Sequence, residues 1–405
     1  MVKPERRTRA DVLAAAAIVL VVAVVAALIW WTSDARATIS RPAATPIPSP
    51  TPARAVPSAL NQLWTAGSPK TTSPVVVGGS VVTGNGRAVE GRDPVIGATR
   101  WSYARDLDLC GVTWVYRYAV AVYPDSRGCG QVSTIDGDTG RRGPARTSYA
   151  DPEVTLSSDG TAVLAAGDSR LELLRSDMVR MISYGALDAR IKPGTPADPL
   201  CRLVSSAASS TAVSVLEACP KQADLRLTLL KPAKEEDTPD VKYVPQPGVT
   251  DDSGARVVAV SETTTAVYVP TPRPMLNVID ETGATMASLP VPKPPVPQAT
   301  MSRAGDLITW WTGDSVMVFS AAGLRYKYTV AAAGPDMPAG PAAMMAGRLI
   351  IPVTAGIGVY DPATGANERY IPVQRPPGQA AVVPAVTGST LLEQRGDTVV
   401  ALGAP

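Results

Sequence analysis

Four cysteines are the residues of this chain whose number and spacing most directly indicate chemistry: Cys110, Cys129, Cys201 and Cys219. An even number of cysteines in an exported domain predicts disulfide bonds, and four cysteines allow three pairings. In the pairs Cys110–Cys129 and Cys201–Cys219, one cysteine precedes two apolar strand-like runs and the other follows them. We therefore predict these two disulfides, each stapling one hairpin. A zinc site is disfavoured because the chain has no C-x-x-C motif and no histidine.

The absence of histidine limits catalytic chemistry more than any other feature of the composition. It excludes Ser-His-Asp and Cys-His machinery, His-ligated zinc and imidazole acid–base catalysis. The acidic clusters at residues 234–237 and 251–252 are more typical of solvated loops than of metal sites. The glycines within residues 78–86 interrupt strand-like runs with no helix after them, so they predict hairpin turns and not a phosphate loop. We expect no catalytic residue, no cofactor and no metal, and the sequence assigns no ligand-binding residue.

Residues 12–31 form a run of twenty residues without a charge. At ~1.5 Å per residue, a helix of this length spans ~30 Å, the thickness of a bilayer core. Trp30 and Trp31 fall where an interfacial aromatic belt would lie, and the preceding cations predict a cytoplasmic N-terminus. Those cations are Lys3, Arg6, Arg7 and Arg9. A cleaved signal peptide is the competing interpretation, with small residues at Ala35 and Ala37, but the apolar run is long for one.

Residues 32–59 are rich in proline mixed with Ala, Thr and Ser, which predicts an extended spacer without packed structure. Such a spacer would hold a domain tens of Å from the bilayer. The expected organisation is a cytoplasmic segment (1–11), a transmembrane helix (12–31), a linker (32–59) and a periplasmic domain (60–405). With Lys+Arg 38 against Asp+Glu 36, the chain lacks the excess of basic residues that is typical of nucleic-acid-binding proteins.

The exported region repeats one pattern, in which a strand-like run ends in Asp-x-x-x-Gly or a relative of it and a polar-aromatic run follows. Aspartate caps such a turn through its backbone, and glycine supplies the positive φ that reverses the chain. The glycines of the repeats are Gly97, Gly140, Gly283, Gly323 and Gly365. Their local spacing is close to the ~40–50 residues of a propeller blade.

An all-β propeller of eight blades, with seven as the alternative, accounts for these repeats. The last strand-like run, residues 389–402, lacks a fourth strand, and residues 60–64 are expected to supply it and close the ring. Residues 114–122 have the alternation of one strand packed between two sheets. Trp310 and Trp311 are neighbours on a predicted strand, so their side chains point to opposite faces. We expect one of them in the core and the other wedged between blades, with a surface contact as the alternative.

The repeats resemble those of quinoprotein-type (PQQ-like) propellers, best at Asp93, Gly97 and Trp101 and at Asp361 and Gly365. The tryptophan that commonly ends such repeats is missing from most copies. Quinoprotein dehydrogenases have a disulfide between adjacent cysteines, which this chain lacks. The resemblance therefore implies the fold and not the enzyme, because fold alone does not carry function.

Two further stretches carry a closer resemblance: residues 30–38, and residues 109–118 continuing to 126–130 with the cysteine pair Cys110 and Cys129. The whole chain resembles a mycobacterial family of membrane-anchored envelope proteins of the polar growth factor type. That resemblance implies association with the RND-type exporter of trehalose monomycolate and with polar growth. It brings no ligand residues with it.

The sequence thus predicts a non-enzymatic envelope accessory, a membrane-tethered propeller that binds a transporter, a glycolipid such as trehalose monomycolate, or both. Two alternatives remain: an enzyme or cofactor-binding propeller that uses carboxylates in the central channel, and a cell-wall glycan-binding sensor. Two carboxylates converging on a pocket would favour the enzyme.

Overall fold

A computed structural model of the chain describes residues 8–187, 201–332, 336–376 and 381–405. Its N-terminal element is α1 (Arg9–Thr32), which starts with a capping box between Thr8 and Asp11 and has no buried residue. The helix is long and apolar enough to cross a membrane, and it fits a single-pass anchor or a signal sequence. Lys3, Arg6 and Arg7 lie outside the described residues. A short helix, α2 (Asp34–Ala37), follows α1.

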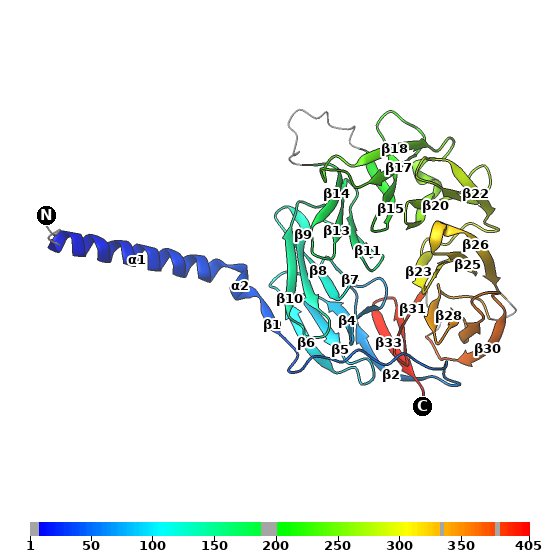
Figure 1. Cartoon of the computed structure of the whole chain (residues 1–405), viewed down its shortest axis with the longest axis horizontal. Coiled ribbons are helices and arrows are strands. Elements are labelled where there is room, and N and C mark those ends of the chain that lie inside the picture. Colours follow the sequence, from blue (N-terminus) through cyan, green and yellow to red (C-terminus); the bar gives the residue numbers. More distant parts are fainter. Residues whose placement is uncertain (1–7, 188–200, 333–335, 377–380) are drawn as a thin grey trace.

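The rest of the chain is an eight-bladed β-propeller, so the expected fold and blade number are confirmed (Figure 1). Each blade is an antiparallel sheet of four strands, and the first blade has a fifth. The first strand of every blade contacts the first strands of both neighbouring blades, and these eight strands therefore surround the central axis. The closed ring leaves no blade with a free face, which is how such folds bury sheets that are apolar on both sides.

The strands of blades 1 to 4, in chain order, are β3 (Val75–Val77), β4 (Ser80–Asn85), β5 (Ala88–Arg92) and β6 (Thr99–Ala104); β7 (Gly111–Val115), β8 (Tyr118–Asp125), β9 (Gly128–Asp136) and β10 (Arg142–Thr147); β11 (Thr155–Ser158), β12 (Ala162–Ala166), β13 (Arg170–Arg175) and β14 (Arg180–Gly185); and β15 (Arg202–Ala208), β16 (Val213–Ala218), β17 (Arg226–Lys231) and β18 (Asp240–Pro245).

The strands of blades 5 to 8 are β19 (Arg256–Ser261), β20 (Thr264–Val269), β21 (Met275–Ile279) and β22 (Thr285–Pro290); β23 (Thr300–Ala304), β24 (Leu307–Trp311), β25 (Ser315–Ser320) and β26 (Tyr326–Ala331); β27 (Ala343–Met345), β28 (Arg348–Val353), β29 (Gly356–Tyr360) and β30 (Asn367–Pro372); and β31 (Val382–Thr387), β32 (Thr390–Arg395), β33 (Thr398–Gly403) and β2 (Asn61–Gly67). Two 3₁₀ turns, η1 (Asp251–Ser253) and η2 (Ala322–Leu324), lie between strands.

Blade 8 closes the ring with strands from both ends of the domain. β2 pairs antiparallel with β33 in the register Asn61↔Gly403 to Gly67↔Thr398. The prediction that residues near 60–64 supply the missing fourth strand is confirmed. Because β2 and β33 come from opposite ends of the domain sequence, their pairing joins the two ends and closes the ring.

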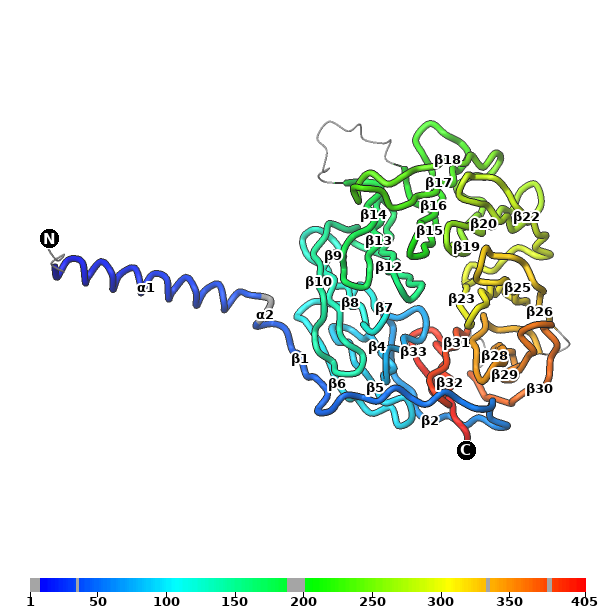
Figure 2. Tube along the Cα trace, viewed as in Figure 1, coloured from blue at the N-terminus to red at the C-terminus, as the bar shows by residue number. Residues whose placement is uncertain are grey.

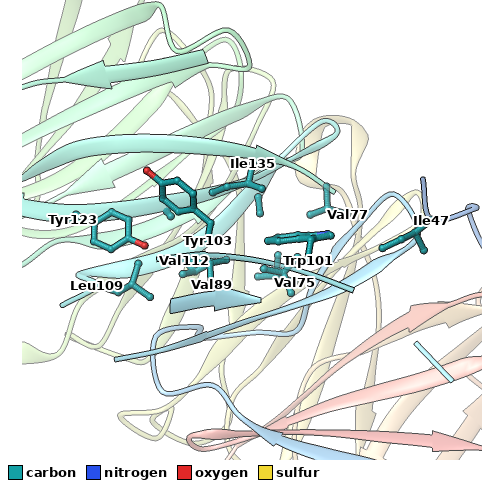
Figure 3. Close-up of a cluster of buried hydrophobic side chains, with 13 residues drawn as sticks. Ile47, Val75, Val77, Val89, Trp101, Tyr103, Leu109, Val112, Tyr123 and Ile135 are labelled. Atoms are coloured by element: carbon teal, nitrogen blue, oxygen red, sulfur yellow. The ribbon is translucent and has the colours of Figure 1, made fainter. Parts of the chain in front are cut away.

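Buried side chains fill the seams between blades. Trp310 packs with Tyr268 of blade 5, whereas its neighbour Trp311 packs with Ile351 and Val353 of blade 7. The two side chains lie on opposite faces of β24, as their adjacent positions predict, and both are buried, so neither makes the surface contact that was the alternative. The seam between blades 1 and 2 is filled around Trp101 (Figure 3).

The Asp-x-x-x-Gly motifs occupy one structural position, the turn between the third and fourth strands of a blade. Asp361 Oδ1 accepts hydrogen bonds from the backbone N–H groups of Ala363 and Thr364, and Gly365 follows at φ +74°. Asp93, Asp136 and Asp280 cap the equivalent turns of blades 1, 2 and 5. The predicted mechanism of the corner is confirmed.

Residues 114–122 do not form one strand. The chain reverses at Tyr116 and Arg117, so that β7 and β8 make a hairpin with Val115 opposite Tyr118. Tyr116 takes φ 52°, a conformation that side chains rarely adopt, and no Gly or Asn marks the turn. The prediction of a single strand over these residues is wrong, because the alternating pattern of side chains continues across a two-residue turn.

The proline-rich segment is not the free spacer that its composition predicts. Ile39–Arg41 forms β1, a fifth strand on the outer edge of blade 1 that pairs with β6. Residues 42–59, which we call the strap, then cross one face of the ring from blade 2 towards blade 7 (Figure 2).

Contacts along the strap explain why it is packed. The N–H of Ile47 donates to the carbonyl of Asp138 on blade 2, and the Ile47 side chain is buried in the cluster around Trp101 (Figure 3). Further along, Val56 packs against the core of blades 7 and 8, and Arg369 Nη2 donates to the Val56 carbonyl at 2.6 Å. Isolated apolar residues between prolines are buried, and the extended backbone offers unpaired polar groups to the loops beneath.

Candidate functional site

Both predicted disulfides are present in the described part of the chain. Cys110, just before β7, is bonded to Cys129 on β9, and Cys201, just before β15, is bonded to Cys219 after β16. Each bridge therefore closes one hairpin, as expected. Two disulfides are typical of a domain in an oxidising compartment.

Among the described residues, one group brings metal-type ligand atoms together: Cys201, Glu217 and Cys219. Their environment does not fit a cation. The two sulfurs are bonded to each other, and Arg226 Nη2 donates to Glu217 Oε2 at 2.9 Å. Burial, followed by the charge of Glu217, raises the pKa of the neighbouring Tyr184. We interpret this group as a buried structural network in blade 4.

The acidic clusters noted in the sequence make ion pairs between elements. Glu236, between β17 and β18, accepts a hydrogen bond from Arg180 of blade 3 at 2.7 Å. Asp251, in η1, pairs with Arg202 at the start of blade 4. Both carboxylates serve the packing of blades, and neither contributes to a group of potential metal ligands in the described residues.

A small cavity between blades 2 and 3 is lined by two carboxylates, Asp151 and Glu172. Its volume is about 20 Å³, room for one water. Asp151 accepts bonds from the N–H groups of Ser169 and Arg170, and Glu172 accepts one from Arg180. Because both carboxylates already hold protein donors and the cavity is so small, this pair is not arranged to act on a substrate.

A larger cleft of about 320 Å³ lies between blades 5 and 6. One wall is the end of β22 and the proline-rich crossing after it, and the other is the outer half of blade 6. The lining residues that give it its character are Val291, Pro292, Lys293, Met317, Tyr326 and Thr329. The volume is at the lower end of the range of ligand pockets.

The chemistry of this cleft is that of a binding site with an apolar body and a polar edge. Met317 and the prolines supply apolar surface, and the Tyr326 hydroxyl lies 3.0 Å from the Thr329 hydroxyl. Lys293 Nζ donates to Asp314 Oδ2 at 2.7 Å, and this hydrogen bond lowers the pKa of Asp314. The cleft is lined by no carboxylate and its lysine is paired with Asp314, so it can hold an aliphatic group beside a hydroxyl but has no acid–base pair.

Reasoning from the sequence did not find this cleft. Its signal was present in the run of residues 290–297, which has five prolines in eight positions. Prolines lack the N–H that a strand ladder needs, so the crossing is joined to its neighbours by few backbone hydrogen bonds, among them those of the Val291 and Val296 N–H groups to the carbonyls of Pro274 and Thr312.

No family model matches the chain, and no curated protein matches it. Solved structures do. BamB from Moraxella catarrhalis matches with a TM-score of 0.51 and 14% identity, over 85% of this chain and 100% of that chain. The C-terminal WD40 domain of Sif2 matches with a TM-score of 0.52 and 11% identity, over 87% of this chain and 100% of that chain. At these identities the similarity shows the propeller fold alone.

Proposed function

We propose that this protein is a non-enzymatic, membrane-tethered propeller that binds partners in the cell envelope. The observation that carries the proposal is the joining of a helix able to span a membrane to a rigid closed ring. A ring of this kind presents loops and seams for binding, while the anchor raises its effective concentration beside membrane partners. The two disulfides support a position of the ring in an oxidising compartment, which is the periplasmic side in this proposal.

The specific partners we propose follow from the family resemblance: an RND-type lipid exporter and trehalose monomycolate, in support of envelope biogenesis and polar growth. The cleft between blades 5 and 6 supports a glycolipid ligand, because it combines apolar walls with hydroxyl groups. An acyl chain needs such walls, and a sugar headgroup needs such donors and acceptors.

Crosslinking in native membranes tests the partner. A photoreactive amino acid in place of Tyr326, at the cleft, should capture an integral membrane protein or a co-purifying glycolipid. The same group in place of Tyr149, an exposed tyrosine between blades 2 and 3, should not. Equal capture at both positions would contradict a role for the cleft.

The tether is tested separately. A domain released without residues 1–31 should fold but fail to support envelope function at normal expression, and an unrelated anchor should restore function. Ser49→Cys in the strap should react with an impermeant thiol reagent on intact cells. Full complementation by the untethered domain, or turnover of a small substrate by the pure protein, would refute the accessory role.

A further inference from the structure

The connection between the apolar helix and the ring is short. Only residues 33–38 separate the end of α1 at Thr32 from the start of β1 at Ile39. Fully extended, six residues span about 20 Å, and α2 shortens that reach. Because β1 and the strap are hydrogen-bonded to the ring, they cannot add length to the connection. The outer edge of blade 1 must therefore stay near the end of α1, as Figure 1 shows.

The end of α1 has the features of a membrane interface. Trp30 and Trp31 are exposed in the last turn, and the Arg36 guanidinium lies 3.6 Å from the ring centroid of Trp31. Tryptophan and arginine at this position are typical of the headgroup level of a bilayer. The ring thus begins a few residues above that level.

Blade 1 also exposes apolar side chains. Beyond α1, the most exposed branched aliphatic residues of the described chain are Ile96 (66%), Val95 (56%) and Ile39 (54%), followed by Val179 (48%). The first three all belong to the outer part of blade 1. Asp93 Oδ1 accepts bonds from the N–H groups of Val95 and Ile96, which fixes these two residues in a rigid corner. Ile39 pairs with Ala104 at the far end of β6 from this corner, so the exposed aliphatic groups mark both ends of the outer edge of blade 1.

Cations accompany these apolar residues. Arg41 on β1 and Arg100 on β6 are exposed, and neither forms an ion pair within the described part of the chain. The register places Arg41 opposite Ser102 and Ile39 opposite Ala104, so these residues and Arg100 share one face of the β1–β6 ribbon. The nearby carboxylates Asp106 and Asp108 are paired with Arg87.

We propose that the outer edge of blade 1 lies on the headgroup layer of the bilayer that holds α1. In this arrangement Arg41 and Arg100 contact the phosphates of anionic phospholipids, and Ile39, Val95 and Ile96 enter the interface. Mixed aliphatic and basic side chains are the chemistry that recognises such a surface. The ring then stands on its rim, and the cleft of blades 5 and 6 lies on the side away from the membrane. This inference rests on the proposed membrane anchor.

The test uses the full chain in nanodiscs whose lipids carry a nitroxide near the headgroup. A fluorophore is attached to one engineered cysteine at a time: Ile96→Cys on the rim, Met286→Cys on blade 5 as the equally exposed control, and Ala17→Cys in α1 as the reporter of insertion. We expect several-fold stronger quenching at position 96 than at 286, with strong quenching at 17. Replacing Arg41 and Arg100 by serine should reduce quenching at 96 in anionic nanodiscs.

The outcomes separate the two proposals. Quenching at 17 with equal, weak quenching at 96 and 286 would overturn the rim contact and leave the anchor standing. No quenching at any position would overturn both. Protection of position 96 from aqueous iodide without quenching by the lipid nitroxide would place a protein against the rim, and would overturn the assignment to lipid.

Discussion

Arg375 Nη2 lies 2.6 Å from Glu393 Oε1, and their side chains are 5% and 0% exposed. Arg375 also donates to the carbonyls of Val353 and Gly356 on blade 7, whereas Glu393 is on β32 of blade 8. Arg395 Nε donates to Oε2 of the same carboxylate at 2.7 Å, an oxygen that Arg375 Nε also reaches at 3.1 Å. One buried carboxylate therefore balances two guanidinium groups at the seam between the last two blades.

Glu393→Gln should destabilise the ring strongly. The substitution keeps the shape of the side chain but leaves two buried cations without a counter-charge, a change that costs about 3–5 kcal/mol when one partner of a buried pair is removed. The measurement is urea unfolding of the purified full chain in detergent, followed by tryptophan fluorescence.

The matched control is Glu368→Gln, which removes the partner of Arg348 in an exposed pair with an N–O distance of 2.7 Å. Exposed pairs contribute about 1 kcal/mol or less. Equal losses in the two variants would show that the seam of blades 7 and 8 does not depend on the buried charge.

The two disulfides should each stabilise one blade. Replacing Cys110 and Cys129 together by serine, or Cys201 and Cys219 together, reopens a loop with a sequence separation of 19 or 18 residues. In the chain-entropy model each loss is about 3 kcal/mol. Melting curves of the two double variants measure it. Non-reducing peptide maps of the unaltered protein should show only these two linked pairs, and crossed pairs or free thiols would refute the assignment.

Sequence reasoning succeeded where one residue type determines local geometry. The turn aspartates with their glycines, and the cysteines flanking apolar runs, have a direct physical meaning, so blade number and pairing could be derived from them. Ring closure by β2 followed from counting strands, because a blade without its fourth strand would leave an edge unpaired.

Reasoning from the sequence failed where the local structure depends on contacts between residues far apart in the chain. The turn at Tyr116 has no turn residue, and composition alone cannot show that Ile47 finds a pocket beside Trp101. The cleft of blades 5 and 6 depends on how the crossing after β22 lies against blade 6. Local patterns do not encode such distances.

The turn aspartates predict a specific dependence of stability on pH. Hydrogen bonds from the backbone and side chain of Thr364, and from the backbone of Ala363, hold the pKa of Asp361 below its usual value. A depressed folded pKa contributes stability above the unfolded pKa, roughly 3.9, and that stability is lost as pH falls through the folded value. The propeller should therefore lose stability below about pH 4 as this turn is protonated.

Two substitutions separate charge from capping at this turn. Asp361→Asn keeps an acceptor but does not titrate, so its thermal midpoint should fall less steeply with acid than that of the unaltered protein. Asp361→Ala removes the cap and should lower the midpoint at every pH. Asp224→Asn, at an exposed position outside such a turn, is the control. The same acid profile for Asp361→Asn and the unaltered protein would rule out the titration of this carboxyl as a cause.

Outside the blades, we expect the largest local loss of structure from a single substitution in the strap. Ile47→Asp would place a carboxylate in the cluster around Trp101, and an unpaired charge is not tolerated in such surroundings. The amides of Ala43 and Ile47, which donate to Thr139 and Asp138, should then exchange at least about tenfold faster, the factor that corresponds to 1.4 kcal/mol. Hydrogen exchange measured by mass spectrometry reports this opening.

Thr45→Asp, at an exposed strap position, is the matched control and should leave exchange unchanged. Gly79→Ala offers an independent route, because a Cβ there would lie 2.5 Å from the Pro48 carbonyl oxygen and must displace the strap from below. A released strap would lengthen the tether to tens of Å, and lipid quenching at position 96 should fall with it if the chain between Thr32 and β2 becomes free. Unchanged exchange in both Ile47→Asp and Gly79→Ala would mean that these contacts do not hold the strap on the ring.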